Sequence, residues 1–229
     1  MQRTPPLEER IAPTRSALLV VDMQNDFVHP EGATAQWMRE RFRQEGKELP
    51  SGPSLTEQMV PRLQRLVAEA RRVGVPVIWV RMEHDAATRD RYTQSEGWLY
   101  CERGSWGAAF YGDLGPAPGE QVVTKRRHSA FFGTDLEAAL RARGVDGVLV
   151  TGTATQGCVE GTVRDANAHD FWAVVVGDCC GQPDPVSHQA ALERMNRVFG
   201  VNASAEEVIA VWQQAAGATA VGSAEQVAG

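Results

Sequence analysis

The sequence predicts an α/β protein, in which a six-stranded parallel sheet lies between two helical layers in one three-layer α/β/α domain. Its apolar runs are short and rich in Val and Leu, as expected of strands buried on both faces. Segments with helical periodicity separate most of these runs, and such alternation is typical of a parallel sheet. The chain has 229 residues and is 43% hydrophobic, which is enough to bury one sizeable core.

Six segments are predicted as strands, and helices are predicted before four of them. The strands are expected at 16–22, 75–81, 121–125, 147–152 and 172–178, with a weaker one near 197–201. The helices are expected at 54–74, 134–144, 158–170 and 186–199. Gly74 and Gly144 stand where helices should stop, and Ser204 with Glu207 forms a capping box that opens a last helix through Trp212. We therefore expect one domain over 15–215, between a flexible N-terminal segment (1–14) and a flexible tail (216–229).

Composition excludes several classes of partner. Lys and Arg number 23 against 29 Asp and Glu, and a formal net charge of −6 argues against a nucleic-acid ligand. No stretch approaches the roughly 20 apolar residues that cross a bilayer, and the N-terminus has no apolar core, so we expect a cytoplasmic protein without a membrane partner. The four cysteines fit neither a disulfide scaffold nor paired zinc ligands. Roles for Cys101, Cys179 and Cys180 stay open.

Three residues with complementary chemistry end or follow predicted strands. Asp22 closes the first strand, Lys125 closes the third, and Cys158 opens a helix directly after the fourth. Because ligands of open parallel sheets bind beyond the carboxyl ends of the strands, these side chains are expected to meet at one edge. A helix N-terminus and a nearby ammonium both favour the thiolate, so we expect a reactive Cys158. Asp22 suits the general base and acid work of amide cleavage.

Three separated motifs make the sequence resemble the isochorismatase-like cysteine hydrolases over roughly 14–212. They are D-M-Q-N-D-F from Asp22, K-x-x-x-S-A-F-x-x-T-x-L from Lys125, and G-x-A-T-x-x-C-V through Cys158 with R-D-A after it. The resemblance implies a Rossmann-like fold and a catalytic triad of these Asp, Lys and Cys residues. It also implies a cis peptide between Ala154 and Thr155, and an oxyanion hole formed by the backbone N–H groups of Thr155 and Cys158.

The motifs look closest to members that act on ureido or carbamoyl compounds, namely the biuret, ureidoacrylate and carbamoylsarcosine amidohydrolases. Gln156 and Gly157 depart from the usual ureido pattern, and Gly157 is similar to the carbamoylsarcosine and maleamate enzymes. We expect a small linear amide, ureido or carbamoyl substrate. Thioester formation at Cys158 would release ammonia or an amine, and Asp22 would then activate water.

Four residues near the predicted edge are candidates for substrate binding. Gln24 and Phe27 follow Asp22 on the same loop, Gln156 precedes the nucleophile, and Trp106 could add an apolar wall. His84 is followed by a single Asp, which are too few ligands and wrongly spaced for the metal of nicotinamidases. We therefore expect no metal and no other cofactor.

Other readings of the sequence stay open. A Cys-His hydrolase would use His128 or His169 as base, although His169 lies about three helical turns beyond Cys158. A nicotinamide-like amide and an isochorismate-like vinyl ether are alternative substrates, and vinyl-ether members of the family lack the nucleophilic cysteine. A non-catalytic binding protein on this fold is the alternative from another class. By resemblance, we expect a homodimer or homotetramer.

Overall fold

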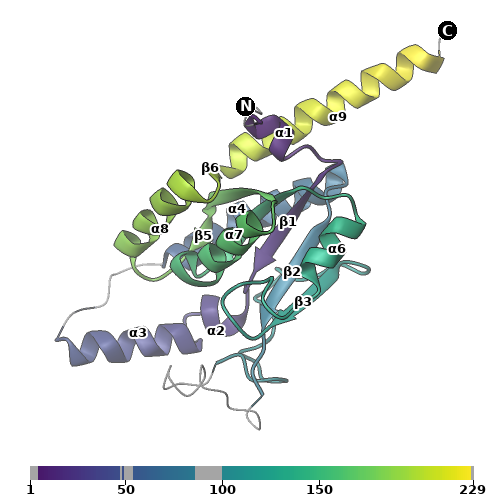
Figure 1. Cartoon of the computed structure of the whole chain (residues 1–229). Helices are drawn as coiled ribbons and strands as arrows, with labels where there is room; N and C mark the ends of the chain where they lie inside the picture. The colour runs from purple at the N-terminus through teal and green to yellow at the C-terminus, as the bar shows by residue number, and fades with distance from the viewer. Residues whose placement is uncertain (1–4, 47, 49–53, 86–99, 228–229) are drawn as a thin grey trace.

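A parallel sheet forms the middle of the molecule (Figure 1). The computed structural model describes residues 5–46, 48, 54–85 and 100–227, without the side chains of 218–227. In this part of the chain the strands are β1 (Ser16–Val21), β2 (Val77–Met82), β3 (Gln121–Lys125), β4 (Gly147–Thr153), β5 (Trp172–Gly181) and β6 (Val201–Ala203). Their order is β3-β2-β1-β4-β5-β6, and each neighbouring pair is parallel. The predicted fold class is confirmed.

The helices include those predicted before β2, β4, β5 and β6. They are α1 (Leu7–Arg10), α2 (Asn25–Val28), α3 (Ala33–Gln44), α4 (Leu55–Val73), α6 (Leu136–Ala142), α7 (Glu160–Ala168), α8 (Pro185–Val198) and α9 (Ala205–Val227). A π-helical turn, η2 (Thr155–Val159), precedes α7. Gly74 and Gly144 have left-handed φ values of 79° and 68° at the ends of α4 and α6. The predicted capping box is also present, because Ser204 and Glu207 each bond the other's backbone N–H.

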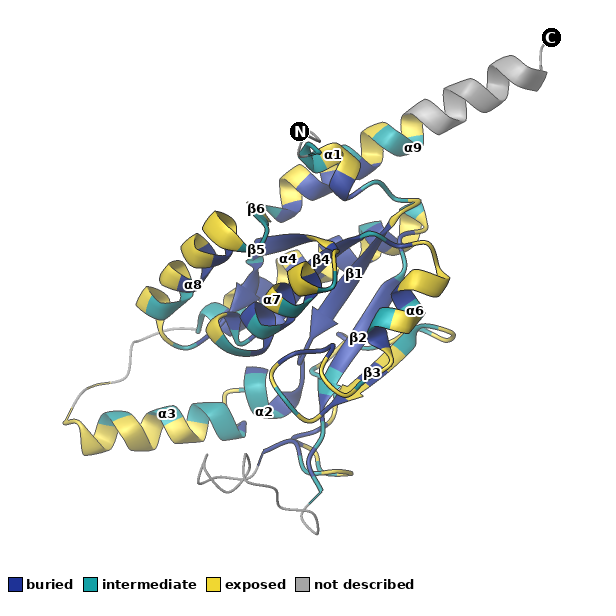
Figure 2. Ribbon diagram, viewed as in Figure 1, coloured by how far each residue is buried: buried dark blue, intermediate teal, exposed yellow. Residues whose placement is uncertain are grey.

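The two faces of the sheet are covered by different helices. Leu19 and Val150 belong to the same apolar cluster as Val163 of α7, together with residues of α6 and α8. Leu18 on the opposite face packs in a second cluster with Leu63 of α4 and with residues of α9. Figure 2 shows the resulting buried strands between more exposed helices. Burial on both faces explains why the strands are nearly continuous apolar runs.

The N-terminal segment is not loose throughout, in contrast to the prediction for 1–14. Ile11 is fully buried, and its carbonyl oxygen accepts hydrogen bonds from Trp212 Nε1 at 2.8 Å and Ser16 Oγ at 3.1 Å. At the other end, α9 continues to Val227, so the segment predicted as a flexible tail is helical to that residue. Alanine is frequent there and has the highest helix propensity, which a search for an apolar face overlooks.

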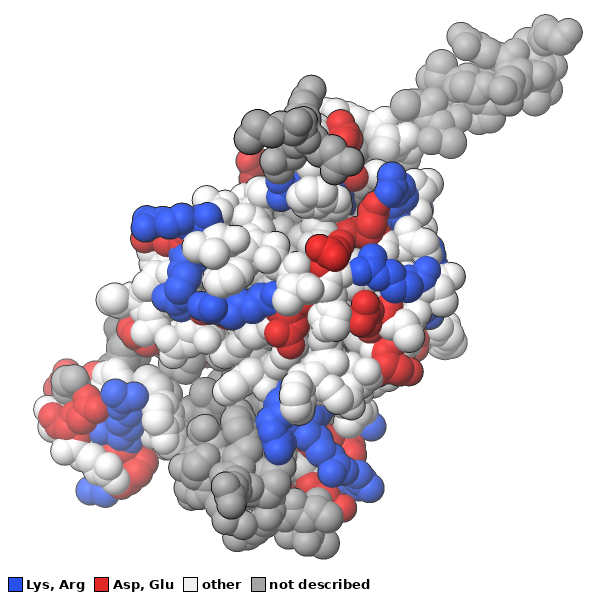
Figure 3. All heavy atoms as spheres, viewed as in Figure 1, with Lys and Arg blue, Asp and Glu red and all other residues white. Residues whose placement is uncertain are grey.

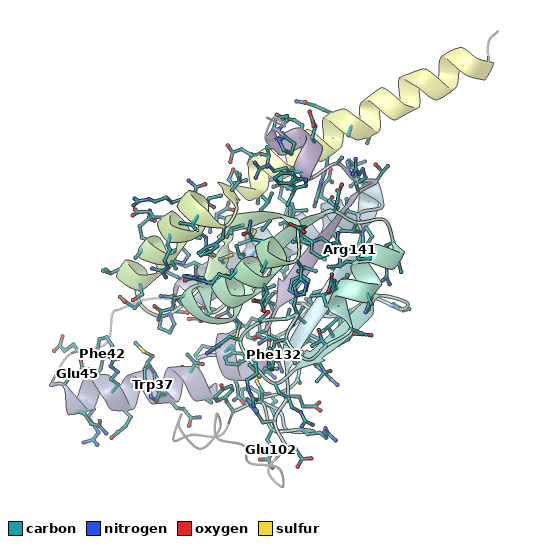
Figure 4. All side chains as sticks on the ribbon, viewed as in Figure 1. Trp37, Phe42, Glu45, Glu102, Phe132 and Arg141 are labelled. Atoms are coloured by element: carbon teal, nitrogen blue, oxygen red, sulfur yellow. The ribbon has the colours of Figure 1, made fainter. Side chains whose placement is uncertain are left out.

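Helix α3 was not predicted. It projects from the body of the molecule, with Trp37 and Phe42 along it (Figure 4), and none of its residues is buried. A helix without a buried face lacks the apolar periodicity on which the prediction depended. Within the described residues, no helix has the length and apolarity needed to cross a bilayer. On the face drawn in Figure 3, basic and acidic side chains are interspersed.

The strand order reverses between β1 and β4, and ligands of open α/β sheets bind at such a switch point. Gly152, near the end of β4, lets these strands approach each other. A Cβ on Gly152 would lie 1.9 Å from the carbonyl oxygen of Val21, and its φ of 107° is unfavourable for other residues. The segments after β1 and β4 therefore leave the sheet side by side.

Trp212 tests whether the N-terminal segment and α9 stabilise the domain. Trp212→Ala removes a fully buried indole and its hydrogen bond to Ile11, so we expect a loss of about 3–5 kcal/mol in the free energy of unfolding. Trp37→Ala, at a side chain 40% exposed, is the control and should cost no more than about 0.5 kcal/mol. Urea denaturation measures both, and equal losses would contradict this assignment.

Candidate active site

Asp22 is the first residue after β1, and its side chain is fully buried. Its backbone has a φ of 52°, in the left-handed region where Asp is one of the few tolerated residues. The Asp22 N–H donates to Val80 O at 2.8 Å, and the Asp22 carbonyl accepts from Gln24 N at 2.8 Å. The chain thus turns sharply at the end of the strand with its carboxylate held at the sheet edge.

Lys125 connects the other two predicted catalytic residues. Its Nζ lies 2.7 Å from Asp22 Oδ2 and donates to Cys158 Sγ at 3.1 Å. A third bond goes to Arg127 O at 3.0 Å, so the three ammonium hydrogens have three acceptors. Lys125 is 1% exposed although β3 is an edge strand. The predicted meeting of Asp22, Lys125 and Cys158 is therefore present in the structure.

Cys158 lies in the π-helical turn between β4 and α7. Ala154 O accepts from the N–H groups of Gly157 at 2.9 Å and Val159 at 3.2 Å, which closes this turn. Short π-helical segments are frequent at functional sites. The thiol is 6% exposed, in contact with Lys125 on one side and near His128 on another.

Burial dominates the acid-base properties of the three residues. It raises the pKa of the Cys158 thiol to about 12, although the Lys125 ammonium opposes the shift. Burial also raises the pKa of Asp22 against the same ammonium. For Lys125, burial acts to lower the pKa, but the charges of Asp22 and Cys158 outweigh it and raise the pKa. The predicted lowering of the thiol pKa is therefore wrong in net direction, because desolvation exceeds the effect of the cation.

Together, these three pKa shifts favour one positive and one negative charge in the site. Lys125 stays protonated, while burial disfavours a negative charge on both Asp22 and Cys158. A buried ammonium requires one anionic partner, and a second anion would be unpaired. Both Asp22 and Cys158 contact Lys125 Nζ, so Asp22 is placed to take the thiol proton while the ammonium compensates the negative charge.

The predicted cis peptide lies one residue earlier than expected. The cis bond joins Thr153 to Ala154, not Ala154 to Thr155. No residue-type signal distinguishes these bonds, since neither precedes a proline. Thr155 is fully buried, and its Oγ1 is 2.8 Å from Nδ1 of His188, whose pKa is lowered by burial. The role of the Thr155 and Cys158 N–H groups as an oxyanion hole stays a prediction.

The predicted substrate-binding residues have different surroundings. Gln24 is fully buried, and its amide bonds to Met82 N, Met82 O and Ala108 O at 2.8–2.9 Å. Those bonds use the polar atoms of Gln24 to hold the loop after β1 on β2, so the structure gives it a supporting position. Phe27 is half-buried, with its ring centroid 5.4 Å from that of Tyr100.

Gln156 and Trp106 are exposed and keep their predicted role as candidates. The Gln156 backbone N–H donates to Oε1 of buried Gln182 at 2.8 Å, and Gln156 itself is exposed. Trp106 is 54% exposed, with its ring centroid 5.0 Å from that of His29. Sequence analysis missed Gln182 and His188, which support Gln156 and Thr155, because they lie about 30 positions further along the chain without a local motif.

The other three cysteines, and the histidines His84 and His169, have surroundings that give no support to a catalytic role. Cys101, Cys179 and Cys180 are buried free thiols whose pKa values burial raises, and among the hydrogen bonds described no cation donates to their sulfur atoms. His84 is buried edge to face against Tyr100. His169 stacks on Phe131 and pairs with Glu137 at 3.0 Å.

Comparison with known proteins decides the family. Residues 16–207 match the isochorismatase domain family. The chain belongs to this family. It is 34% identical to the ureidoacrylate amidohydrolase RutB of Methylobacterium radiotolerans over 208 residues, which cover 82% of this chain and 76% of that protein.

Solved structures agree with this assignment. A cysteine hydrolase from Pseudomonas syringae pv. phaseolicola is 28% identical with a TM-score of 0.74, covering 90% of this chain and 96% of that one. N-carbamoylsarcosine amidase from Thermoplasma acidophilum is 25% identical with a TM-score of 0.66, covering 83% and 96%. The predicted isochorismatase-like hydrolase is confirmed, and amidohydrolases that act on non-peptide C–N bonds are among its relatives.

The buried ion pair is open to a double-mutant test. Lys125→Met leaves the Asp22 carboxylate buried without its cation, so we expect a loss of about 3–5 kcal/mol in the free energy of unfolding. Adding Asp22→Asn should recover part of that loss, because the uncompensated charge is gone. Denaturant titrations of both single variants and the double variant measure the coupling. Additive losses would contradict a coupled pair.

The Asp22→Asn substitution should make the Cys158 thiol more reactive toward an alkylating reagent. Asp22 raises the thiol pKa and Lys125 lowers it, so removing the carboxylate should bring the alkylation midpoint of Cys158 below about pH 12. We expect faster iodoacetamide labelling at pH 7.5 than in the unsubstituted protein, with Cys158→Ala as the blank. Slower labelling would mean that Asp22 already holds the thiol proton at rest.

Proposed function

We propose that this isochorismatase-family protein hydrolyses a C–N bond of a small linear amide, ureido or carbamoyl compound through a thioester on Cys158. The single observation that carries the proposal is the position of Lys125 Nζ, 2.7 Å from the Asp22 carboxylate and 3.1 Å from the Cys158 thiol. A nucleophile, a proton acceptor and a cation are thereby combined at the sheet's switch point. The ureidoacrylate amidohydrolase relative supports the substrate class.

In the acylation step, Asp22 takes the thiol proton as Sγ attacks the substrate carbonyl carbon. Lys125 contacts both Asp22 and Cys158, so its ammonium compensates the negative charge on either side chain. The carbonyl oxygen becomes an oxyanion, for which we propose the N–H groups of Thr155 and Cys158 as donors. The C–N bond then breaks, and the proton on Asp22 passes to the leaving nitrogen. Ammonia or an amine departs, and an acyl thioester remains.

Burial favours this order of events over a preformed thiolate. Because burial raises the pKa of the Cys158 thiol to about 12, attack that coincides with proton transfer to Asp22 is favoured. The acid limb of the pH-rate profile for acylation should lie above the usual range of an Asp, because Asp22 works only as a carboxylate and burial raises its pKa.

Ammonia release tests the function directly. The panel contains biuret, ureido acids, carbamoyl amino acids, maleamate, nicotinamide and simple amides. We expect turnover of ureido or carbamoyl members, loss of turnover in Cys158→Ala, and a 10²–10⁴-fold lower kcat in Asp22→Asn. Ala at position 158 removes only the sulfur, so folding measured by circular dichroism should not change.

Two outcomes would contradict the proposal. Activity that survives in Cys158→Ala would exclude the thioester route. Absence of ammonia from every compound would favour vinyl-ether hydrolysis or a binding role, and the corresponding follow-up is product analysis with isochorismate. Localisation in the cytoplasm and assembly into a homodimer or homotetramer stay predictions.

A further inference from the structure

His128 differs from the three buried catalytic candidates in its access to solvent. It follows β3 by three residues and is exposed, whereas Asp22 and Lys125 are at most 1% exposed. Its Nδ1 is nevertheless 3.6 Å from Sγ of Cys158. The imidazole therefore lies between the nucleophile and the surrounding water.

The loop that carries His128 is held against the nucleophile's helix. Ala130 N donates to Thr162 Oγ1 at 3.0 Å, and Thr162 Oγ1 donates to Cys158 O at 2.7 Å. Gly161 permits the contact, because a Cβ there would lie 3.2 Å from His128 Cβ. The Thr162 hydroxyl thus connects the loop after β3 to the backbone of the residue that bears the thiol.

We propose that His128 is a catalytic residue of the second half-reaction, the general base that activates water for hydrolysis of the Cys158 thioester. This inference rests on the proposed function, since it requires an acyl group on Sγ. The expectation that Asp22 activates that water is the competing assignment. Asp22 is fully buried with Oδ2 bound to Lys125, whereas His128 is on the solvent side of Sγ, and the His128→Ala variant distinguishes these two bases.

The proton and electron balance of this step closes without another reactant. Water oxygen bonds to the thioester carbonyl carbon while one of its protons passes to neutral His128. The tetrahedral intermediate collapses, the C–S bond breaks, and its electron pair goes to Sγ of Cys158. His128 then returns the proton to Sγ, which Nδ1 faces at 3.6 Å. The products are a carboxylic or carbamic acid and the original thiol.

The charges around the imidazole suit this transfer. Asp22 and His128 interact electrostatically, so the carboxylate favours a transiently protonated imidazole. Lys125, also in contact with Sγ, favours the departing thiolate.

His128→Ala separates the two half-reactions. With the panel compound that turns over fastest, we expect a rapid first equivalent of ammonia per active site at close to the unsubstituted rate. Steady-state turnover should then be at least about 100-fold lower. Intact-mass spectrometry should show the acyl adduct on Cys158, and added imidazole should restore part of the turnover. Since His128 is exposed, folding should be unaffected, which circular dichroism checks.

His169→Gln is the matched control, because it changes a histidine that stacks on Phe131 and pairs with Glu137. Its turnover should match that of the unsubstituted protein. The inference is overturned if His128→Ala keeps turnover within threefold, or if its burst and steady-state rates fall equally with no adduct and no rescue by imidazole. Lack of ammonia release by the unsubstituted protein would instead refute the proposed function, and with it this inference.

Discussion

The buried ion pair between Asp22 and Lys125 is the constraint on which the rest of the site depends. Two charges withdrawn from water are stable only when each compensates the other. Their contact at 2.7 Å joins the end of β1 to the end of β3 across the intervening β2. Cys158, brought in by the turn after β4, accepts a hydrogen bond from the Lys125 ammonium of this pair. The backbone turns around the site hold the Asp22 and Cys158 side chains in contact with Lys125.

Contact with an ammonium distinguishes the Cys158 thiol from the other three cysteines. Cys101, Cys179 and Cys180 are buried with raised pKa values, as Cys158 is. Only for Cys158 does an ammonium donate directly to sulfur among the bonds described for these four residues. Desolvation suppresses a free thiolate, which limits reaction with unrelated electrophiles. The hydrogen bond from Lys125 stabilises negative charge on the Cys158 sulfur while proton transfer and bond formation take place.

Polar side chains that do no chemistry hold the surrounding loops. Gln24 holds the loop after β1 through two bonds to Met82 at the end of β2 and one to Ala108, and Gln182 holds the start of the turn that carries the nucleophile. Thr162 connects the loop after β3 to Cys158. Each of these residues satisfies buried backbone groups that a loop would otherwise leave unpaired. Sites assembled from separate loops need such bonds, because no single element fixes the relative positions of the reacting atoms.

The sequence by itself determined the sheet, most helices between its strands and the identity of the central trio. Apolar runs report burial directly, and polar residues at strand ends share an edge in any parallel sheet. Tertiary structure alone decided the sign of the Cys158 pKa shift, because desolvation depends on the packing of distant segments. It also decided that the cis bond precedes Ala154, that Gln24 supports a loop, and that His128 reaches the thiol. These properties depend on distances between residues remote in the chain, which no local pattern encodes.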